Sequence, residues 1–279
     1  MKKIARLTGK LYWGNWRFLL ALVGLMLFYL WYATRALPPT GYSAFMNFYD
    51  GNASVMDTAL AFGLEDPKQY ADLDAVYQAY IAVNSPFFYR KCITNGAAGV
   101  YFIVMILSLW VVNHAVNGSA CRVLLMQGCR RAPICAGLLL TYLISVLLCC
   151  GGGMAVTLLT RPIDYALLPE AYLRRSLSCW ALFTVEAAAL LAIPAFTLKM
   201  TWAILTDIGL LVLLSILRPL RALVSPAILA ADELWEAEGF SLHTGSAIPV
   251  AVGVIVFAAV FTGRYFRRKE LSAQPSQSI

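Results

Sequence analysis

The sequence predicts an all-α membrane protein with six transmembrane helices. Of the 279 residues, 60% are hydrophobic and only 13% are charged, whereas soluble domains contain about 45–50% apolar and about 25% charged residues. The apolar residues are gathered into runs close to the roughly 20 residues that a helix needs to cross a hydrocarbon core. Lys and Arg lie mostly at the edges of these runs, which is typical of membrane orientation rather than of a nucleic-acid-binding face.

An amphipathic segment comes first in the chain. Ile4, Leu7 and Leu11 recur at helical spacing, and Lys and Arg occupy the other faces. A helix of this kind lies in the membrane interface, so residues 1–17 are expected to form an interfacial helix at the inner leaflet. The apolar run 18–36 is longer than the about 7–15 residues of a signal-peptide core, and we expect it to be retained as the first span.

Five further apolar runs predict the remaining spans of the transmembrane domain 18–279. They cover about 93–113, 133–160, 176–198, 201–217 and 247–263. The first long connection, 37–92, is expected to lie outside the cytoplasm and to be partly helical, because an apolar stripe runs from Leu73 to Ile81. The glycine triplet 151–153 favours close helix packing, with a hinge as the alternative. Pro194 is expected to kink its span.

The distribution of basic residues predicts the orientation. With the N-terminus inside, the inner segments hold most of the Lys and Arg residues, as the positive-inside rule requires. Both termini are then cytoplasmic. His114 and His243 are too few and too far apart to suggest a metal site, and the seven cysteines form no C-x-x-C pair.

The cytoplasmic connector 114–132 is the most informative polar segment. Asn117 or Ser119 can cap a short helix and Gly128 can end it, and an apolar face is supplied by Val123, Leu124 and Leu125. From these residues alone, two interpretations are equally good. The connector is either a basic amphipathic loop at the membrane surface or a docking helix that fits a groove on a cytoplasmic partner.

The order of these elements resembles ABC-2-type transporter permeases, the membrane subunits of type V ABC exporters. The shared features are the amphipathic first helix, the large outer loop, the connector after the second span, the short hairpin between the fourth and fifth spans, and the basic tail 264–270. In that family the connector is the coupling helix, which seats in a groove of an ATPase subunit. The resemblance implies a set of docking residues on the connector: Gly118, Arg122, Leu124, Leu125, Gly128 and Arg131.

The resemblance also implies a function and partners. It predicts a permease subunit of a bacterial plasma-membrane exporter that works with ABC ATPase subunits, with a second copy or a related permease, and among membrane lipids. The phosphate-binding pattern G-x-x-x-x-G-K-[ST] does not occur in the sequence. ATP and Mg²⁺ are therefore expected on a separate ATPase chain, and this chain is expected to bind no cofactor and to be no enzyme.

Two acidic residues fall inside predicted spans. Glu186 lies near the middle of the fourth span and Asp207 in the inner half of the fifth. An ionised carboxylate at mid-bilayer costs about 2.5–3.5 kcal/mol on insertion scales, so such residues usually face a protein interior or a water-filled path. Both are candidates for the translocation path. For Glu186, a structural role as a protonated or hydrogen-bonded group at a helix contact is an equally good interpretation. For Asp207, which could simply reach the inner interface, the structural role is favoured.

Two other classes of function remain open. A non-transporting anchor or sensor subunit would use the loop 37–92 as its binding surface. An intramembrane enzyme would need a reactive set of side chains facing the bundle interior. Only Glu186 and Asp207 qualify, and they lie on different spans at different depths.

Overall fold

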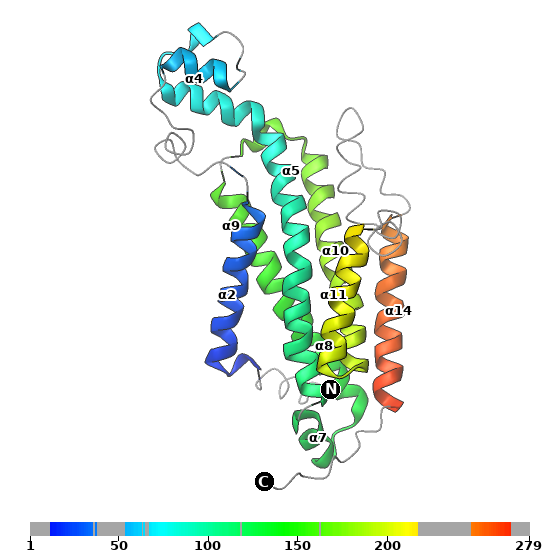
Figure 1. Cartoon of the computed structure of the whole chain (residues 1–279). Coiled ribbons are helices and arrows are strands. Elements are labelled where there is room, and N and C mark those ends of the chain that lie inside the picture. Colours follow the sequence, from blue (N-terminus) through cyan, green and yellow to red (C-terminus); the bar gives the residue numbers. More distant parts are fainter. Residues whose placement is uncertain are drawn as a thin grey trace.

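The structure of the protein is a computed structural model, and it is an elongated bundle of helices (Figure 1). The structure describes residues 12–35, 37, 54–62, 64, 67–117, 119–161, 163–216 and 247–268, and within these ranges it contains helices and no β-strand. Most of the predicted interfacial helix 1–17 lies outside the described residues. The all-helical prediction is confirmed for the described part of the chain.

Five helical stretches are long and apolar enough to cross a membrane. They are α2 (Trp16–Ala33), α5 with its continuation (Leu73–Asn117), α8 with its continuation (Arg131–Thr160), α10 (Glu170–Thr197) and α14 (Ala247–Arg268, in which the apolar stretch begins at Ile248). The predicted span 201–217 corresponds to α11 (Met200–Ile216), an apolar helix of 17 residues. Several long apolar helices thus make this a multi-pass membrane protein.

Helix α5 is longer than the sequence analysis expected. It runs from Leu73 to Leu107 and continues through the π-helix η2 (Ser108–Asn113) and α6 (His114–Asn117), 45 residues in all. At 1.5 Å per residue this is about 67 Å, roughly twice the thickness of a hydrocarbon core. The predicted span 93–113 is therefore the inner part of a continuous helix.

The projecting part of α5 belongs to the segment 37–92 and confirms that this segment is partly helical. The side chain of Asp72 caps the helix by accepting from the backbone N–H of Ala75 at 2.8 Å. The short helix α4 (Val55–Ala61) packs on this end (Figure 1), and Ala59, Leu64 and Val76 form its small buried core. A head of α4 and the first turns of α5 therefore extends beyond the bundle.

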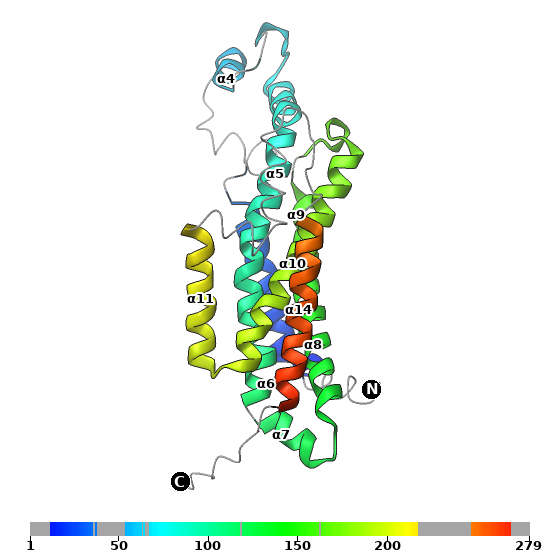
Figure 2. The same ribbon diagram turned by 90° about the vertical axis from the view of Figure 1, so that its right-hand side faces the viewer.

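The remaining helices pack around α10. Helix α14 contacts α10 and α8, whereas α11 contacts α10, η2 and α5, so the two flank α10 from different sides (Figure 2). The third span consists of α8 (Arg131–Val146), the π-helix η3 (Leu147–Gly151) and α9 (Gly152–Thr160). Helix α2 packs on α5, η3 and α9.

Glycines allow α2 to approach its neighbours closely. Tyr29 of α2 is fully buried. A Cβ at Gly153 would lie 3.0 Å from Cγ and 3.2 Å from Cβ of Tyr29, and a Cβ at Gly96 would meet the Tyr29 hydroxyl. No neighbour lies within 4 Å of the corresponding point at Gly151. The glycine triplet is part of a continuous helix, and at Gly153 it serves close packing as expected.

Gly153→Ala should lower the melting temperature of the protein in detergent. The added methyl group forces the ring and Cβ of Tyr29 to move, and overpacking of this kind costs about 1–3 kcal/mol. Gly151→Ala is the matched control in the same triplet, and because it meets open space it should leave the melting temperature unchanged or raise it. The melting temperatures are measured by size-exclusion chromatography after heating. Equal melting temperatures for the two variants would contradict the packing of Tyr29 against Gly153.

Candidate functional site

The connector forms a short helix at the end of the bundle opposite α4 (Figure 1). This helix, α7 (Ser119–Met126), joins α6 to α8. Gly128 follows it with a φ of 78°, a left-handed conformation that suits glycine. The N–H of Gly128 donates to the carbonyl of Leu125 at 3.0 Å, and the N–H of Cys129 donates to that of Leu124 at 3.1 Å. These two bonds form a Schellman motif, so Gly128 ends the helix as predicted.

The two faces of α7 differ sharply in exposure. Cys121 and Leu124 are 1% and 5% exposed and belong to the main hydrophobic core, and Leu125 packs against that core. On the other side, Val123 and Met126 are 48% and 81% exposed. The helix α7 therefore packs against the bundle with one apolar face and exposes a second apolar face.

This arrangement places both leucines of the inferred docking set on the side of the bundle, and the docking set itself stays a prediction. Leu124 is buried in the bundle and Leu125 is half-buried against it, because residues three and four apart from Cys121 share its face. The exposed apolar side chains are those of Val123, which the sequence analysis placed on the apolar face but not in the docking set, and of Met126, which it did not single out. Their spacing of three residues was the available signal, but spacing alone does not say which of two apolar faces a bundle covers.

The remaining predicted docking residues lie around α7 in different ways. Gly118 is outside the described residues. Arg122 is half-buried, and Gly128 is exposed. The Nη1 of Arg131 donates to the carbonyl of Arg267 at 3.1 Å, which ties the start of α8 to the last turn of α14.

The N-terminal segment also reaches this region. The Tyr12 hydroxyl donates to the carbonyl of Val111 in η2 at 2.9 Å. Burial, with a smaller contribution from Cys121, raises the pKa of Tyr12 to about 12. The hydroxyl therefore stays protonated and remains a donor at physiological pH.

Two asparagines link the helices before α7 to the end of α10. The Nδ2 of Asn113 donates to the carbonyls of Ala195 and Leu198, both at 2.9 Å. The Nδ2 of Asn117 donates to the Asn113 Oδ1 and to the Leu198 carbonyl, both at 3.1 Å. We call Asn113 and Asn117 the asparagine clamp.

The clamp meets a need of α10. The last carbonyls of a helix have no partner within it, and the end of α10 lies directly before the tight turn into α11. A further donor comes from α14, where the Tyr265 hydroxyl bonds the carbonyl of Thr197 at 3.2 Å. Pro194 is accommodated inside α10, and the helix continues to Thr197.

The π-helical turn η2 ends at Asn113 itself. A π-helical turn widens the helix and changes the direction of the side chains that follow, and such turns occur frequently at functional sites. The sequence analysis missed Asn113, although a buried amide near the end of an apolar run, here 1% exposed, is the signal that could have found it. Both spans that α7 joins carry a π-helical segment, η2 and η3.

The two carboxylates are both inside the bundle. Glu186 is 0% and Asp207 1% exposed, and neither carboxylate has a hydrogen-bond partner among the described residues. Asp207 lies in the middle of α11 and is covered by the neighbouring helices. No hydrogen bond joins Glu186 to Asp207 in the described part of the chain.

No protein family, curated protein or solved structure matches this chain. Within the described ranges, no three His, Cys, Asp or Glu residues lie together in a way that could hold a metal ion. The features that bear on function are therefore α7, the asparagine clamp and the two buried carboxylates.

Asn113→Ala should loosen the attachment of α7. Removing the amide leaves the carbonyls of Ala195 and Leu198 without this donor, which costs about 1–3 kcal/mol of stability. We expect a lower melting temperature and faster maleimide labelling of Cys121, which is 1% exposed in the intact protein.

Asn95→Ala is the control for the clamp. Asn95 lies in the middle of the same continuous helix and donates to the Arg35 carbonyl, just past the end of α2, at 2.9 Å in an exposed setting. Its removal should leave Cys121 labelling unchanged. If Asn113→Ala does not accelerate the labelling of Cys121, the clamp does not hold α7.

Proposed function

We propose that this chain is the membrane-spanning permease subunit of an ATP-binding cassette exporter of the ABC-2 type. It forms the translocation path and is driven by a separate ATPase that docks on α7. The position of α7 is the observation that carries this proposal. A short amphipathic helix lies beyond the spans at one end of the bundle, is ended by a Schellman motif, and connects two long spans.

The exposed face of α7 suits a groove on a partner protein. Met126 and Val123 offer an apolar contact, and Met side chains adapt readily to a partner's surface. Exposed Arg130 and half-buried Arg122 lie beside them, so a groove with an apolar floor and acidic rims is complementary. The side chains of Leu124 and Leu125 act from the other side by keeping α7 on the bundle.

The contacts of α7 support a mechanical link to the spans. Movement of α7 acts directly on α6 and α8, which it joins. Through the asparagine clamp the same movement acts on the end of α10 and the turn into α11. ATPase closure would thus shift four of the six proposed membrane helices together, as alternation between inward-open and outward-open states requires.

The proposal includes the membrane setting and partners. The protein lies in the bacterial plasma membrane with six spans, α11 being the fifth, and with both termini and α7 in the cytoplasm. ATP and Mg²⁺ are bound by the ATPase. A second copy or a related permease completes the path, to which Glu186 and Asp207 contribute buried carboxylates.

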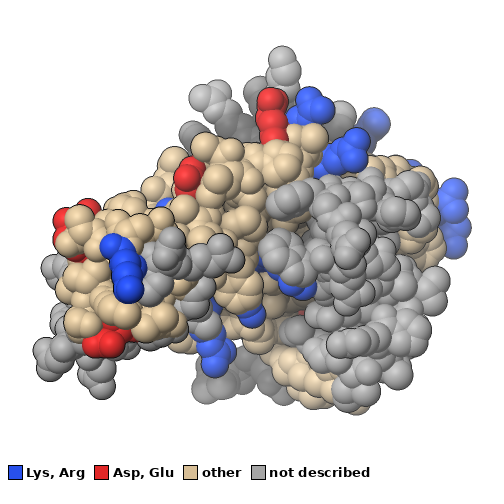
Figure 3. All heavy atoms as spheres, turned by 90° about the horizontal axis from the view of Figure 1, so that it is seen from above, with Lys and Arg blue, Asp and Glu red and all other residues tan. Residues whose placement is uncertain are grey.

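A second candidate function is a non-transporting sensor or anchor subunit, and the projecting head favours it. The head carries exposed Met56 and Leu60 on α4 and Val83 on α5. Acidic and basic side chains are interspersed on the face seen from this end (Figure 3), so among the described residues it shows no field of a single sign. A sensor would bind its ligand with this head while α7 remained free of any ATPase.

Met126→Glu should prevent co-purification of an ABC ATPase from native membranes. The carboxylate would have to be buried in the docking groove without a partner, and burying an unpaired charge at an interface costs about 2–5 kcal/mol. Met56→Glu is the control, because it makes the same change at an exposed methionine on α4. An ATPase that binds both variants equally excludes docking on this face, and the absence of any ATPase with the unchanged protein favours the sensor.

Glu186→Gln should impair ATP-driven export without weakening the protein or its bound ATPase. The amide has the shape of the carboxyl group but cannot ionise in the membrane, so the melting temperature should stay the same or rise. Export in everted vesicles, measured with a compound that stimulates the ATPase, should fall by about tenfold or more.

Thr184→Val is the control for Glu186, since it changes another fully buried polar side chain of α10 without altering charge. Export should be retained in this variant. If Glu186→Gln exports as well as the unchanged protein, Glu186 takes no part in the translocation path.

A further inference from the structure

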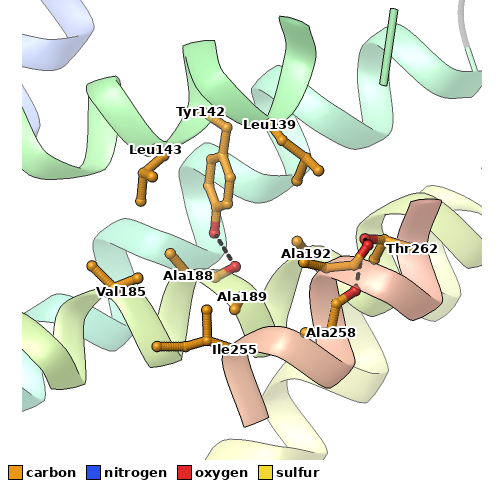
Figure 4. A pocket seen from close by; sticks show the side chains of 11 residues that line it. Leu139, Tyr142, Leu143, Val185, Ala188, Ala189, Ala192, Ile255, Ala258 and Thr262 are labelled. Carbon is orange, nitrogen blue, oxygen red and sulfur yellow. Dashed lines mark hydrogen bonds between the residues drawn. The ribbon is translucent and has the colours of Figure 1, made fainter. Parts of the chain in front are cut away.

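A partly enclosed pocket lies between α8, α10 and α14 (Figure 4). Its volume is about 150 Å³. Leu139 and Tyr142 line it from α8, Ala188 and Ala189 from α10, and Ile255 and Thr262 from α14. Small alanine side chains on α10 and α14 keep this space open where the two helices cross.

The pocket leaves no polar group for a ligand. Its two polar side chains are Tyr142 and Thr262, and both are engaged with backbone carbonyls (Figure 4). The Tyr142 hydroxyl donates to Ala188 at 3.2 Å, and the Thr262 hydroxyl donates to Ala258 at 2.7 Å. The rest of the lining is apolar, so a hydrocarbon group fits and a headgroup or a polar solute does not.

The size and depth of the pocket agree with such an occupant. An apolar cavity of about 150 Å³ stays free of water and accepts a molecule the size of benzene. All lining residues belong to the candidate spans Arg131–Thr160, Glu170–Thr197 and Ile248–Arg268. Each lies more than one helical turn from the nearest end of its span, which places the pocket within the hydrocarbon layer.

The pocket also reaches the outer surface of the bundle. Ala259 lines it and is exposed. Leu140 and Ile144 of α8 and Val256 of α14, which belong to the helices that form its rim, are 49%, 40% and 55% exposed. In a bilayer such apolar surfaces are covered by lipid chains, so the hydrocarbon that can enter from this side is part of a lipid.

We propose that this pocket binds a segment of one acyl chain of a membrane phospholipid, wedged between α10 and α14. The hydrocarbon fills the space that the alanines leave between α14 and the neighbouring helices α8 and α10. The lipid is thus part of the packing of α14. This inference does not depend on the transport function.

The proposal can be tested with a photoactivatable lipid. The full chain is reconstituted in vesicles of phosphatidylethanolamine and phosphatidylglycerol, of which a fraction carries a diazirine in the middle of one acyl chain. After illumination, labelled peptides are located by mass spectrometry. We expect adducts on residues 185–192 and 255–262, with the exposed side chains Leu147 and Leu148 as the reference for ordinary surrounding lipid.

Ala189→Phe fills the pocket and should reduce labelling of these segments by about tenfold relative to the reference. Val260→Phe is the matched control, because Val260 is exposed on α14 and does not line the pocket; its labelling should match the unchanged protein. Leu143→Ala enlarges the opposite wall and should increase labelling, which keeps the test informative if Ala189→Phe does not fold.

Three results would overturn the proposal. If neither Ala189→Phe nor Leu143→Ala changes the labelling of the pocket segments, these segments contact surface lipid only. If the pocket segments stay unlabelled and Ala259→Cys forms a disulfide-linked dimer, a second copy of the chain covers the site. Labelling that a free apolar compound abolishes, while Leu147 and Leu148 stay labelled, assigns the pocket to a transported molecule instead.

Discussion

Every backbone polar group inside a membrane has to find its hydrogen-bond partner within the protein, because hydrocarbon offers none. Helices meet this requirement along their length but not at their ends. Helix α10 ends directly at the turn into α11, and its last carbonyls accept from Asn113, Asn117 and Tyr265. The end of α10 thereby sets the positions of η2, α6 and α14 relative to one another.

Close packing supplies the second constraint. Lipid tails are as apolar as leucine, so helices in a membrane associate through van der Waals contact and hydrogen bonds rather than through the hydrophobic effect. Tyr29 is held between Gly96 and Gly153, where no side chain intervenes. At the other side of the bundle, alanines of α10 and α14 leave a pocket instead. Small residues thus have opposite effects in the two places, depending on whether a large side chain faces them.

The candidate site follows from these two constraints. The asparagine clamp holds the spans next to α7, and Cys121 and Leu124 hold α7 on the bundle. As a result α7 presents Val123 and Met126 outward without leaving the bundle. Glu186 and Asp207 are the fully buried carboxylates of the described part of the chain, and neither has a hydrogen-bond partner there.

The sequence by itself determined the helical membrane class, the apolar stripe from Leu73 to Ile81 and the end of α7 at Gly128. These features depend on local composition, spacing and backbone conformation, which neighbouring residues carry. Only the tertiary structure decided that Leu124 is buried while Met126 is exposed, that α5 is one continuous helix, that Asn113 bonds the end of α10, and that Asp207 lies inside the bundle. Periodicity shows that a helix has an apolar face, but the neighbour that covers this face comes from a distant part of the chain.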